Sequence, residues 1–285
     1  MDRISLGGMV AKMKTIVSFG DSFIFGSELQ NNHDGSKAWP GLIATDFNCN
    51  YKTFAEVGCG NEAIARQIFT YFSSNSSQDT LAVINWTWCM RWDFYLSGIN
   101  KWISLGPTCA PDKLQNLLDT TNSHELINFY RSYISDSQTW NQLRSLQTIL
   151  ATQSFLKNNK IKNIQTYMDR ELFMPSVTKS RLEHYNAFKD TSWPEITSEH
   201  DINTLPGYIK TELDQDYLSS KDPEYIQILQ KLALEEIQDF EGKTFLEWSH
   251  FQGFEITPVP REHPLEKAHY AAADLWAPRY KQKLQ

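Results

Sequence analysis

"TIVSFGDSFIFGSEL" (residues 15–29) is an apolar run that ends in Gly-Asp-Ser and passes directly into a second apolar run. The first run lacks strict alternation of apolar and polar side chains, which is typical of a strand buried on both faces of a parallel sheet. Ser22 would then lie at the carboxyl end of that strand, where α/β sheets hold their ligands. Taken alone, the stretch leaves two interpretations open: Ser22 is a nucleophile, or Asp21 and Ser22 form a turn that caps a helix.

Four further segments are predicted as buried strands of the same sheet. They are YKTFAEV (51–57), TLAVINW (80–86), NIQTYM (163–168) and KTFLEW (243–248). Residues 60–72 and 139–159 carry apolar side chains at helical spacing, which predicts crossover helices between strands. The alternation predicts a three-layer α/β/α sandwich around a central, mostly parallel five-stranded sheet.

Residues 13–285 are interpreted as a single domain, because no repeat, charge block or low-complexity linker divides them. Residues 1–12 are expected to form a loose tail. Two intervals, at about 88–140 and 170–242, are too long for simple connections and are predicted as insertions. Helical spacing after Pro223 predicts a helix within the second one, over residues 223–240. Such insertions form lids or specificity walls, or they add packing and oligomer contacts.

Composition excludes several classes of function. The formal net charge of −7 argues against nucleic acid as a partner, because phosphate binding requires clustered Lys and Arg. No apolar run reaches the roughly 18 residues that a membrane span needs, and the N-terminal stretch lacks the apolar core of a secretory signal. The cysteines show no metal-ligand spacing and are expected as free thiols, so neither a metal nor a cofactor is predicted. They are Cys49, Cys59, Cys89 and Cys109.

A serine nucleophile needs a base, and the stretch PREHPLEKAHYAAADLWAP (260–278) offers His263. Pro264 favours the first turn of a helix, so His263 is predicted in the loop just before that helix. From a loop after the last strand, its side chain can reach Ser22 over the edge of the sheet. His269 is predicted inside the helix, as a structural residue.

The order of these motifs resembles the SGNH/GDSL hydrolase superfamily, and in detail the SGNH-like proteins often found in phage genomes. Gly-Asp-Ser follows the first strand, Gly58 and Gly60 follow the second, and His263-Pro264 precedes the last helix; the resemblance covers residues 15–87 and 243–280. It implies the flavodoxin-like SGNH fold and a Ser-His acyl-enzyme mechanism on carboxylic esters. Within that mechanism Ser22 would be the nucleophile, His263 the base and then the acid, and the N–H groups of Ser22 and Gly58 oxyanion donors.

One departure from the family pattern concerns the residue that orients the base. The family has an aspartate three residues before the histidine, and this chain has Pro260 there. Glu262 is the nearest carboxylate, and it serves only if the loop turns between it and His263. Otherwise a backbone carbonyl would fix the tautomer of the imidazole. Asp21 is expected to brace the nucleophile turn.

A second departure concerns the oxyanion hole. The family's side-chain donor, an asparagine, falls near Cys89, so Thr87 or Arg91 is expected to supply the missing donor. Arg91, Asn61 and Trp88 are candidate substrate-binding residues, although a helix cap is the more economical role for Asn61. The aromatic residues near this turn fit packing or a sugar-stacking wall. They are Trp86, Trp88, Trp92 and Tyr95.

Three functions follow from these residues. The first is a serine esterase, with a small ester or an acylated carbohydrate as substrate and acetyl as one acyl group. The second is a binding or structural protein on the same fold whose catalytic set has decayed, for example in a virion. The third is acyl transfer to a sugar, which uses the same residues. A cytoplasmic or virion-associated location is expected, and the oligomeric state is not predicted.

Overall fold

A computed structural model describes residues 15–106, 120–135, 138–168, 172, 223–258 and 262–284. At its centre lies a four-stranded parallel sheet with the strand order β2-β1-β3-β6. The strands are β1 (Thr15–Phe19), β2 (Asn50–Thr53), β3 (Thr80–Trp86) and β6 (Lys162–Tyr167). The parallel sheet confirms the predicted fold class, and β3 has the predicted bounds.

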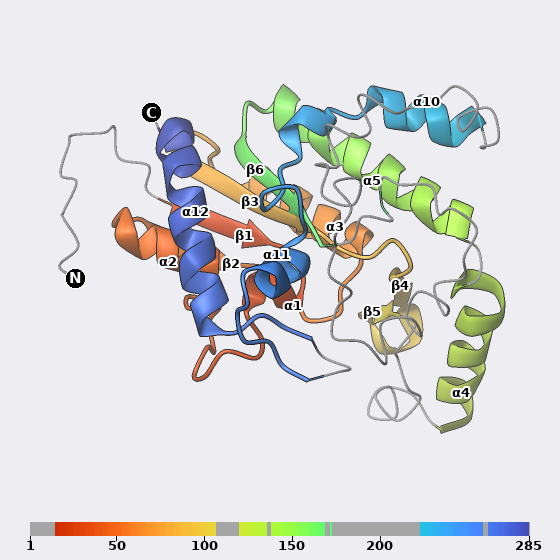
Figure 1. Cartoon of the computed structure of the whole chain (residues 1–285). Helices are drawn as coiled ribbons and strands as arrows, with labels where there is room; N and C mark the ends of the chain where they lie inside the picture. Colours follow the sequence, from red (N-terminus) through yellow and green to blue (C-terminus); the bar gives the residue numbers. More distant parts are fainter. Residues whose placement is uncertain are drawn as a thin grey trace.

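Helices cover both faces of this sheet, so the chain forms three layers (Figure 1). One face is covered by α2 (Trp39–Asp46), α11 (Phe245–Phe251) and α12 (Glu266–Leu284), and the other by α3 (Asn61–Ser74) and α5 (Gln138–Asn158). Successive residues of a strand point to opposite faces, so β3 contributes to two cores. Val83 packs with the first group of helices and Ala82 with the second.

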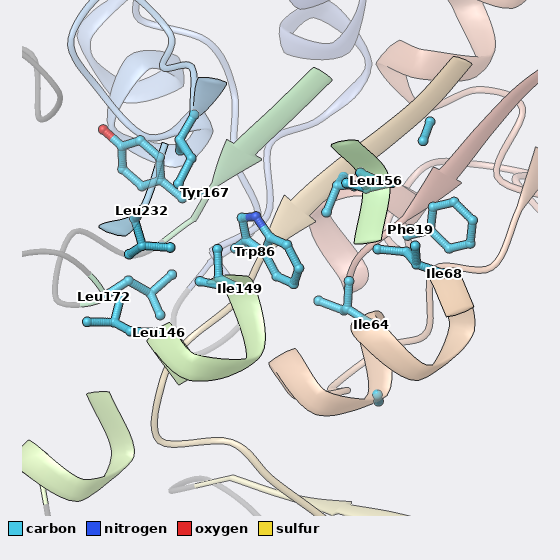
Figure 2. Packing of buried hydrophobic residues seen from close by; sticks show 14 of the residues in the cluster. Phe19, Ile64, Ile68, Trp86, Leu146, Ile149, Leu156, Tyr167, Leu172 and Leu232 are labelled. Atoms are coloured by element: carbon cyan, nitrogen blue, oxygen red, sulfur yellow. The ribbon is translucent and has the colours of Figure 1, made fainter. Parts of the chain in front are cut away.

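Figure 2 shows the core between the sheet and the second group of helices. Trp86 lies in its middle and is fully buried, together with Ile64 of α3 and Ile149 of α5. The indole Nε1 donates a hydrogen bond to Gln165 Oε1 at 3.0 Å, which satisfies its one polar group. Of the two interpretations of the aromatic residues, packing therefore applies to Trp86.

The predicted fifth strand, residues 243–248, is wrong, because these residues begin helix α11 instead. Thr244 caps that helix: its hydroxyl accepts from Glu247 N, and the Glu247 carboxylate accepts from Thr244 N. This capping box favours a helix over a strand whatever the apolar content of the segment. Among the described residues, Ile237 forms an isolated parallel bridge with Gln165 of β6, and the sheet has four strands.

The first predicted insertion, at 88–140, contains an antiparallel hairpin and a helix. They are β4 (Trp92–Leu96), β5 (Lys101–Leu105) and α4 (Thr120–Phe129). From the second, at 170–242, the structure describes residues 172 and 223–242, including α10 (Pro223–Lys231), which packs on α5. The predicted helix over 223–240 is thus shorter, and a 3-10 turn (Leu234–Glu236) follows it. The predicted tail, residues 1–12, lies outside the described residues.

Cys59 and Cys89 are buried, and no disulfide joins cysteines of the described residues. Cys109 lies outside them. Within the same part of the chain, no group of His, Cys, Asp and Glu side chains is arranged to hold a metal ion. None of the helices described there is both long and apolar enough to cross a bilayer.

Candidate active site

The Gly-Asp-Ser turn leaves β1 at the carboxyl edge of the sheet. Helix α1 (Ser22–Phe25) begins with the serine, and Asp21 caps it, because Asp21 Oδ1 accepts from Phe23 N at 3.1 Å. Gly20 lets the turn pack tightly: a Cβ there would lie only 2.5 Å from a side-chain atom of α1. The structure thus combines both features suggested by the sequence, a helix cap at Asp21 and a serine directly after it.

His263 lies in the loop that precedes α12. Its Nε2 is 2.8 Å from Ser22 Oγ, although 241 residues separate the two along the chain. The backbone of His263 pairs with Thr257: its N–H donates to Thr257 Oγ1 at 2.8 Å, and its carbonyl accepts from Thr257 N at 2.9 Å. Its ring stacks on Phe23 with centroids 4.7 Å apart. The structure therefore brings together the residues predicted as nucleophile and base, at hydrogen-bond distance.

The role of Glu262 toward His263 stays a prediction. Its φ of 44° lies in the left-handed region, so the loop does turn between Glu262 and His263. Burial raises the pKa of Glu262. Pro260, at the family's aspartate position, lies outside the described residues.

Asp21 also forms a buried ion pair beside the serine. Its Oδ2 accepts from Arg91 Nη1 at 2.7 Å and from Thr87 Oγ1 at 2.8 Å. The same Arg91 nitrogen lies 2.5 Å from Thr87 Oγ1 and 3.2 Å from Cys59 O. Asp21 is fully buried and Arg91 is 8% exposed. Nη1 of the guanidinium is thus bound by three protein acceptors, so we do not assign this nitrogen to substrate contact or to the oxyanion hole.

Thr87 and Asn61 bind each other at the end of β3. Thr87 N donates to Asn61 Oδ1 at 2.9 Å, and Asn61 Nδ2 donates to Thr87 O at 3.1 Å. Because the Thr87 hydroxyl already donates to Asp21, both donors of Thr87 are engaged within the protein. Both residues are fully buried. We therefore leave Thr87 out of the proposed oxyanion hole and Asn61 out of the substrate contacts.

The cap of α3 differs from the sequence prediction, which placed it at Asn61. Gly60 is the N-cap residue, and the Asp93 carboxylate of β4 accepts from Gly60 N at 3.2 Å and from Ala63 N at 3.0 Å. A Cβ on Gly60 would lie 2.3 Å from Asp93 Oδ2, so a side chain at this position would displace the capping carboxylate. Asp93 follows these residues by 33 and 30 positions, and local spacing therefore gave no signal for it.

Gly58 occupies a tight turn beside the nucleophile turn. Cys59 N donates to Glu56 O at 3.3 Å, and Gly58 has a φ of 82°, a conformation that favours glycine. Glu56 N donates to Gly20 O at 3.0 Å, which holds the two turns side by side. A Cβ on Gly58 would meet nothing within 4 Å, so the position faces open space. This turn carries the second predicted oxyanion donor.

The remaining candidates, Cys89 and Trp88 in the loop after β3, make structural contacts. Cys89 is fully buried in the core, and its carbonyl accepts from Arg144 Nη2 at 3.1 Å. Trp88 is half-buried against the first group of helices, with the Arg91 guanidinium 4.9 Å from its ring centroid. These contacts favour the packing interpretation of Trp88.

Exposed aromatic residues of the hairpin border a different part of the surface. Tyr95 and Trp102 are 45% and 46% exposed, and their ring centroids are 5.4 Å apart. Trp102 also lies at a hollow of about 500 Å³ on the outer side of α3. The hollow is lined by Phe54, Arg66, Gln67, Thr70, Tyr71, Ser74, Asn75 and Trp102. None of these lining residues is a histidine, so the hollow offers no base for a serine nucleophile. We therefore place the candidate active site at Ser22 and His263 rather than at this hollow.

The fold and this pair place the chain among α/β proteins that carry a serine and a histidine in hydrogen-bond contact at the carboxyl edge of a parallel sheet. No family model and no curated protein matches the sequence. The solved structures that the chain resembles include lipolytic proteins of the G-D-S-L family, an esterase and carbohydrate esterases.

Three of these structures illustrate how distant the likeness is. A G-D-S-L family protein of Veillonella parvula is 11% identical, with a TM-score of 0.42 over 94% of this chain and 99% of its own. A psychrotrophic esterase of Pseudoalteromonas sp. is 12% identical, with a TM-score of 0.45 over 95% and 98%. A family 2 carbohydrate esterase of Corynascus thermopiles is 12% identical, with a TM-score of 0.43 over 98% and 69%. The roles of the site residues therefore rest on the geometry of this chain alone.

Proposed function

We propose that the protein is a serine esterase that cleaves carboxylic esters through an acyl-enzyme. The observation that carries the proposal is the 2.8 Å contact between Ser22 Oγ and His263 Nε2. A neutral imidazole nitrogen at this distance can take the hydroxyl proton as the oxygen attacks a carbonyl. The same contact supports an esterase over a decayed binding protein, because decay would relax the distance between the two side chains.

The reaction proceeds in two halves. Ser22 Oγ attacks the ester carbonyl while His263 Nε2 takes its proton, and the tetrahedral oxyanion accepts from the N–H groups of Ser22 and Gly58. His263 then protonates the leaving alkoxide, which leaves an acyl group on Ser22. Water, deprotonated by the same nitrogen, attacks the acyl-enzyme to form a second tetrahedral intermediate. As this intermediate collapses, His263 returns the proton to Ser22 Oγ, and the acid is released. Each oxyanion donor of this kind is worth roughly 3 kcal/mol in the transition state.

The proposed substrate is a small ester or an acylated carbohydrate, which is the class that the motif resemblance implies. Transfer of the acyl group to a sugar hydroxyl follows the same steps with a sugar in place of water. Products formed in the presence of an acceptor sugar separate the two: free acid indicates hydrolysis, and a new sugar ester indicates transfer.

The test is hydrolysis of p-nitrophenyl esters from acetyl to octanoyl, and of acetylated sugars, by the wild type and two variants. Ser22→Ala should reduce kcat by about 10³-fold or more, because it removes the nucleophile. Ser73→Ala, an exposed serine of α3, is the matched control and should leave the rate unchanged. Equal rates for the wild type and Ser22→Ala would refute the proposal.

A further inference from the structure

One guanidinium nitrogen connects all three loops that surround the candidate site. Arg91 Nη1 contacts Asp21 Oδ2 in the loop after β1, Cys59 O in the loop after β2, and Thr87 Oγ1 in the loop after β3. Asp21 directly precedes Ser22, and Cys59 directly follows Gly58. A single side chain therefore holds the neighbours of both residues to which we assign oxyanion donors.

We propose that Arg91 is a positioning residue that fixes the Ser22 turn and the Gly58 turn at the spacing an oxyanion requires. This inference rests on the proposed esterase function. Arg91 acts through its neighbours: its bound nitrogen faces Asp21, Cys59 and Thr87 rather than the Ser22 hydroxyl. Preorganised donors stabilise the transition state only when their spacing is held in advance, since reorganisation during the reaction would offset the gain.

The contacts of Arg91 depend on its shape as well as on its charge. Nη1 carries two hydrogens and has three oxygen acceptors within 3.2 Å, so the contacts are shared and sensitive to small displacements. Lysine keeps the charge but lacks the planar fork and delivers its ammonium from a flexible stem. A substitution by lysine therefore tests the geometry while it preserves the ion pair with buried Asp21.

The backbone of Arg91 is itself anchored to a second layer of the fold. Arg144 of α5 donates from Nη2 to Arg91 O at 2.7 Å, and its Nη1 pairs with Glu62 of α3 at 2.7 Å. Burial raises the pKa of Glu62 to about 7, although the charge of Arg144 acts to lower it. The position of Arg91 is thus fixed by two helices that take no part in the chemistry.

A positioning role predicts a specific kinetic signature. Displaced oxyanion donors weaken transition-state binding and leave substrate binding intact, so Arg91→Lys should lower kcat about 10- to 100-fold with KM within about twofold of the wild type. Thr87→Val, which removes the shared hydroxyl, should act in the same direction, and Thr87→Ser should restore most of the rate. Arg66→Lys, an arginine of α3 that lies over Trp102, is the control and should not change kcat.

¹H–¹⁵N NMR of the folded wild type and variants measures the position of the two turns directly and complements the kinetic measurements. The amide signals of Ser22 and Gly58 should shift or broaden in Arg91→Lys and Thr87→Val, and stay in place in Arg66→Lys and Thr87→Ser. Unchanged amides and unchanged kcat would overturn the proposal, and so would a raised KM with unmoved amides, which would mark a substrate contact. If the wild type cleaves no ester, the esterase function fails, and the amide signals still decide whether Arg91 holds the two turns. If Arg91→Lys does not fold, the comparison of Thr87→Val with Thr87→Ser, by kcat and by the amide signals of Ser22 and Gly58, decides between the same outcomes.

Discussion

Asp21 serves two purposes with its two carboxylate oxygens. Oδ1 caps the short helix that begins at Ser22, and Oδ2 binds Arg91 and Thr87. Because the carboxylate is fully buried, its charge is compensated by the guanidinium and by hydrogen bonds rather than by water. Asp21 thus caps helix α1 and also attaches that helix to the loop after β3.

His269 lies six residues beyond the proposed base but has a different environment. It is 1% exposed, and its Nδ1 accepts a hydrogen bond from Trp39 N at 3.1 Å. That bond requires an unprotonated Nδ1. Burial lowers the pKa of His269 to about 3, from an ordinary value of 6.5. The prediction that His269 is structural agrees with this placement.

We predict that His269 makes the fold acid-sensitive. Between pH 6.5 and 3 the unfolded chain binds a proton at this residue and the folded chain does not. The free energy of unfolding therefore falls as pH falls, by about 1.4 kcal/mol per pH unit from this group. In His269→Asn, which retains an acceptor, the loss between pH 7 and pH 5 should be smaller by about 2 kcal/mol.

Urea unfolding at the two pH values measures this difference. His33→Asn, which replaces an exposed histidine, is the control and should keep the pH dependence of the wild type. A wild-type pH dependence in His269→Asn as well would show that its protonation does not contribute.

At the scale of elements, the β4–β5 hairpin is attached to α3 by a carboxylate. Asp93 of β4 accepts from the N–H of the cap residue Gly60 and from the N–H of Ala63 in the first turn of α3, and Ser104 of β5 donates to the same carboxylate. The first N–H groups of a helix have no partner within the helix, so a cap from another element satisfies them. The hairpin is therefore part of the support of α3, whatever else the insertion does.

We predict that Asp93→Ala destabilises the protein by about 2–4 kcal/mol, because it leaves two buried N–H groups without an acceptor. Asp93→Asn keeps one acceptor oxygen and should cost less. Asp274→Ala, at an exposed position on α12, is the control. Urea unfolding of the three variants provides the measurement, and equal stability of Asp93→Ala and Asp274→Ala would contradict the assigned cap.

At the scale of the whole molecule, the apolar pattern of the sequence predicted correctly the strand in which every residue is buried. Residues 80–86 are buried without exception and form the central strand β3, as their continuous apolar character indicates. Residues 243–248 also appeared apolar, but the Thr244–Glu247 capping box favoured a helix there. Apolar content alone does not separate a short strand from a short helix, whereas a capping pair does.

The candidate site was predictable to the extent that it consists of short motifs. Gly-Asp-Ser and His263-Pro264 each mark a local turn, and the edge of the parallel sheet accounts for their meeting. The partners of Asp21 were not predictable in this way, because Thr87 and Arg91 lie 66 and 70 residues further along the chain. The spacing of Thr87 and Arg91 predicts that both lie near the site, but it does not indicate which of their donors the protein itself engages.

The central claim is that Ser22 is a nucleophile activated by His263, and covalent labelling tests it most directly. The wild type is incubated with a fluorophosphonate probe, and the modified peptide is mapped by mass spectrometry. We predict a single adduct on Ser22, its absence in Ser22→Ala, and labelling of His263→Ala slower by about 10²-fold or more. An adduct on another residue, no adduct in the folded wild type, or equal labelling of the wild type and His263→Ala would contradict the claim.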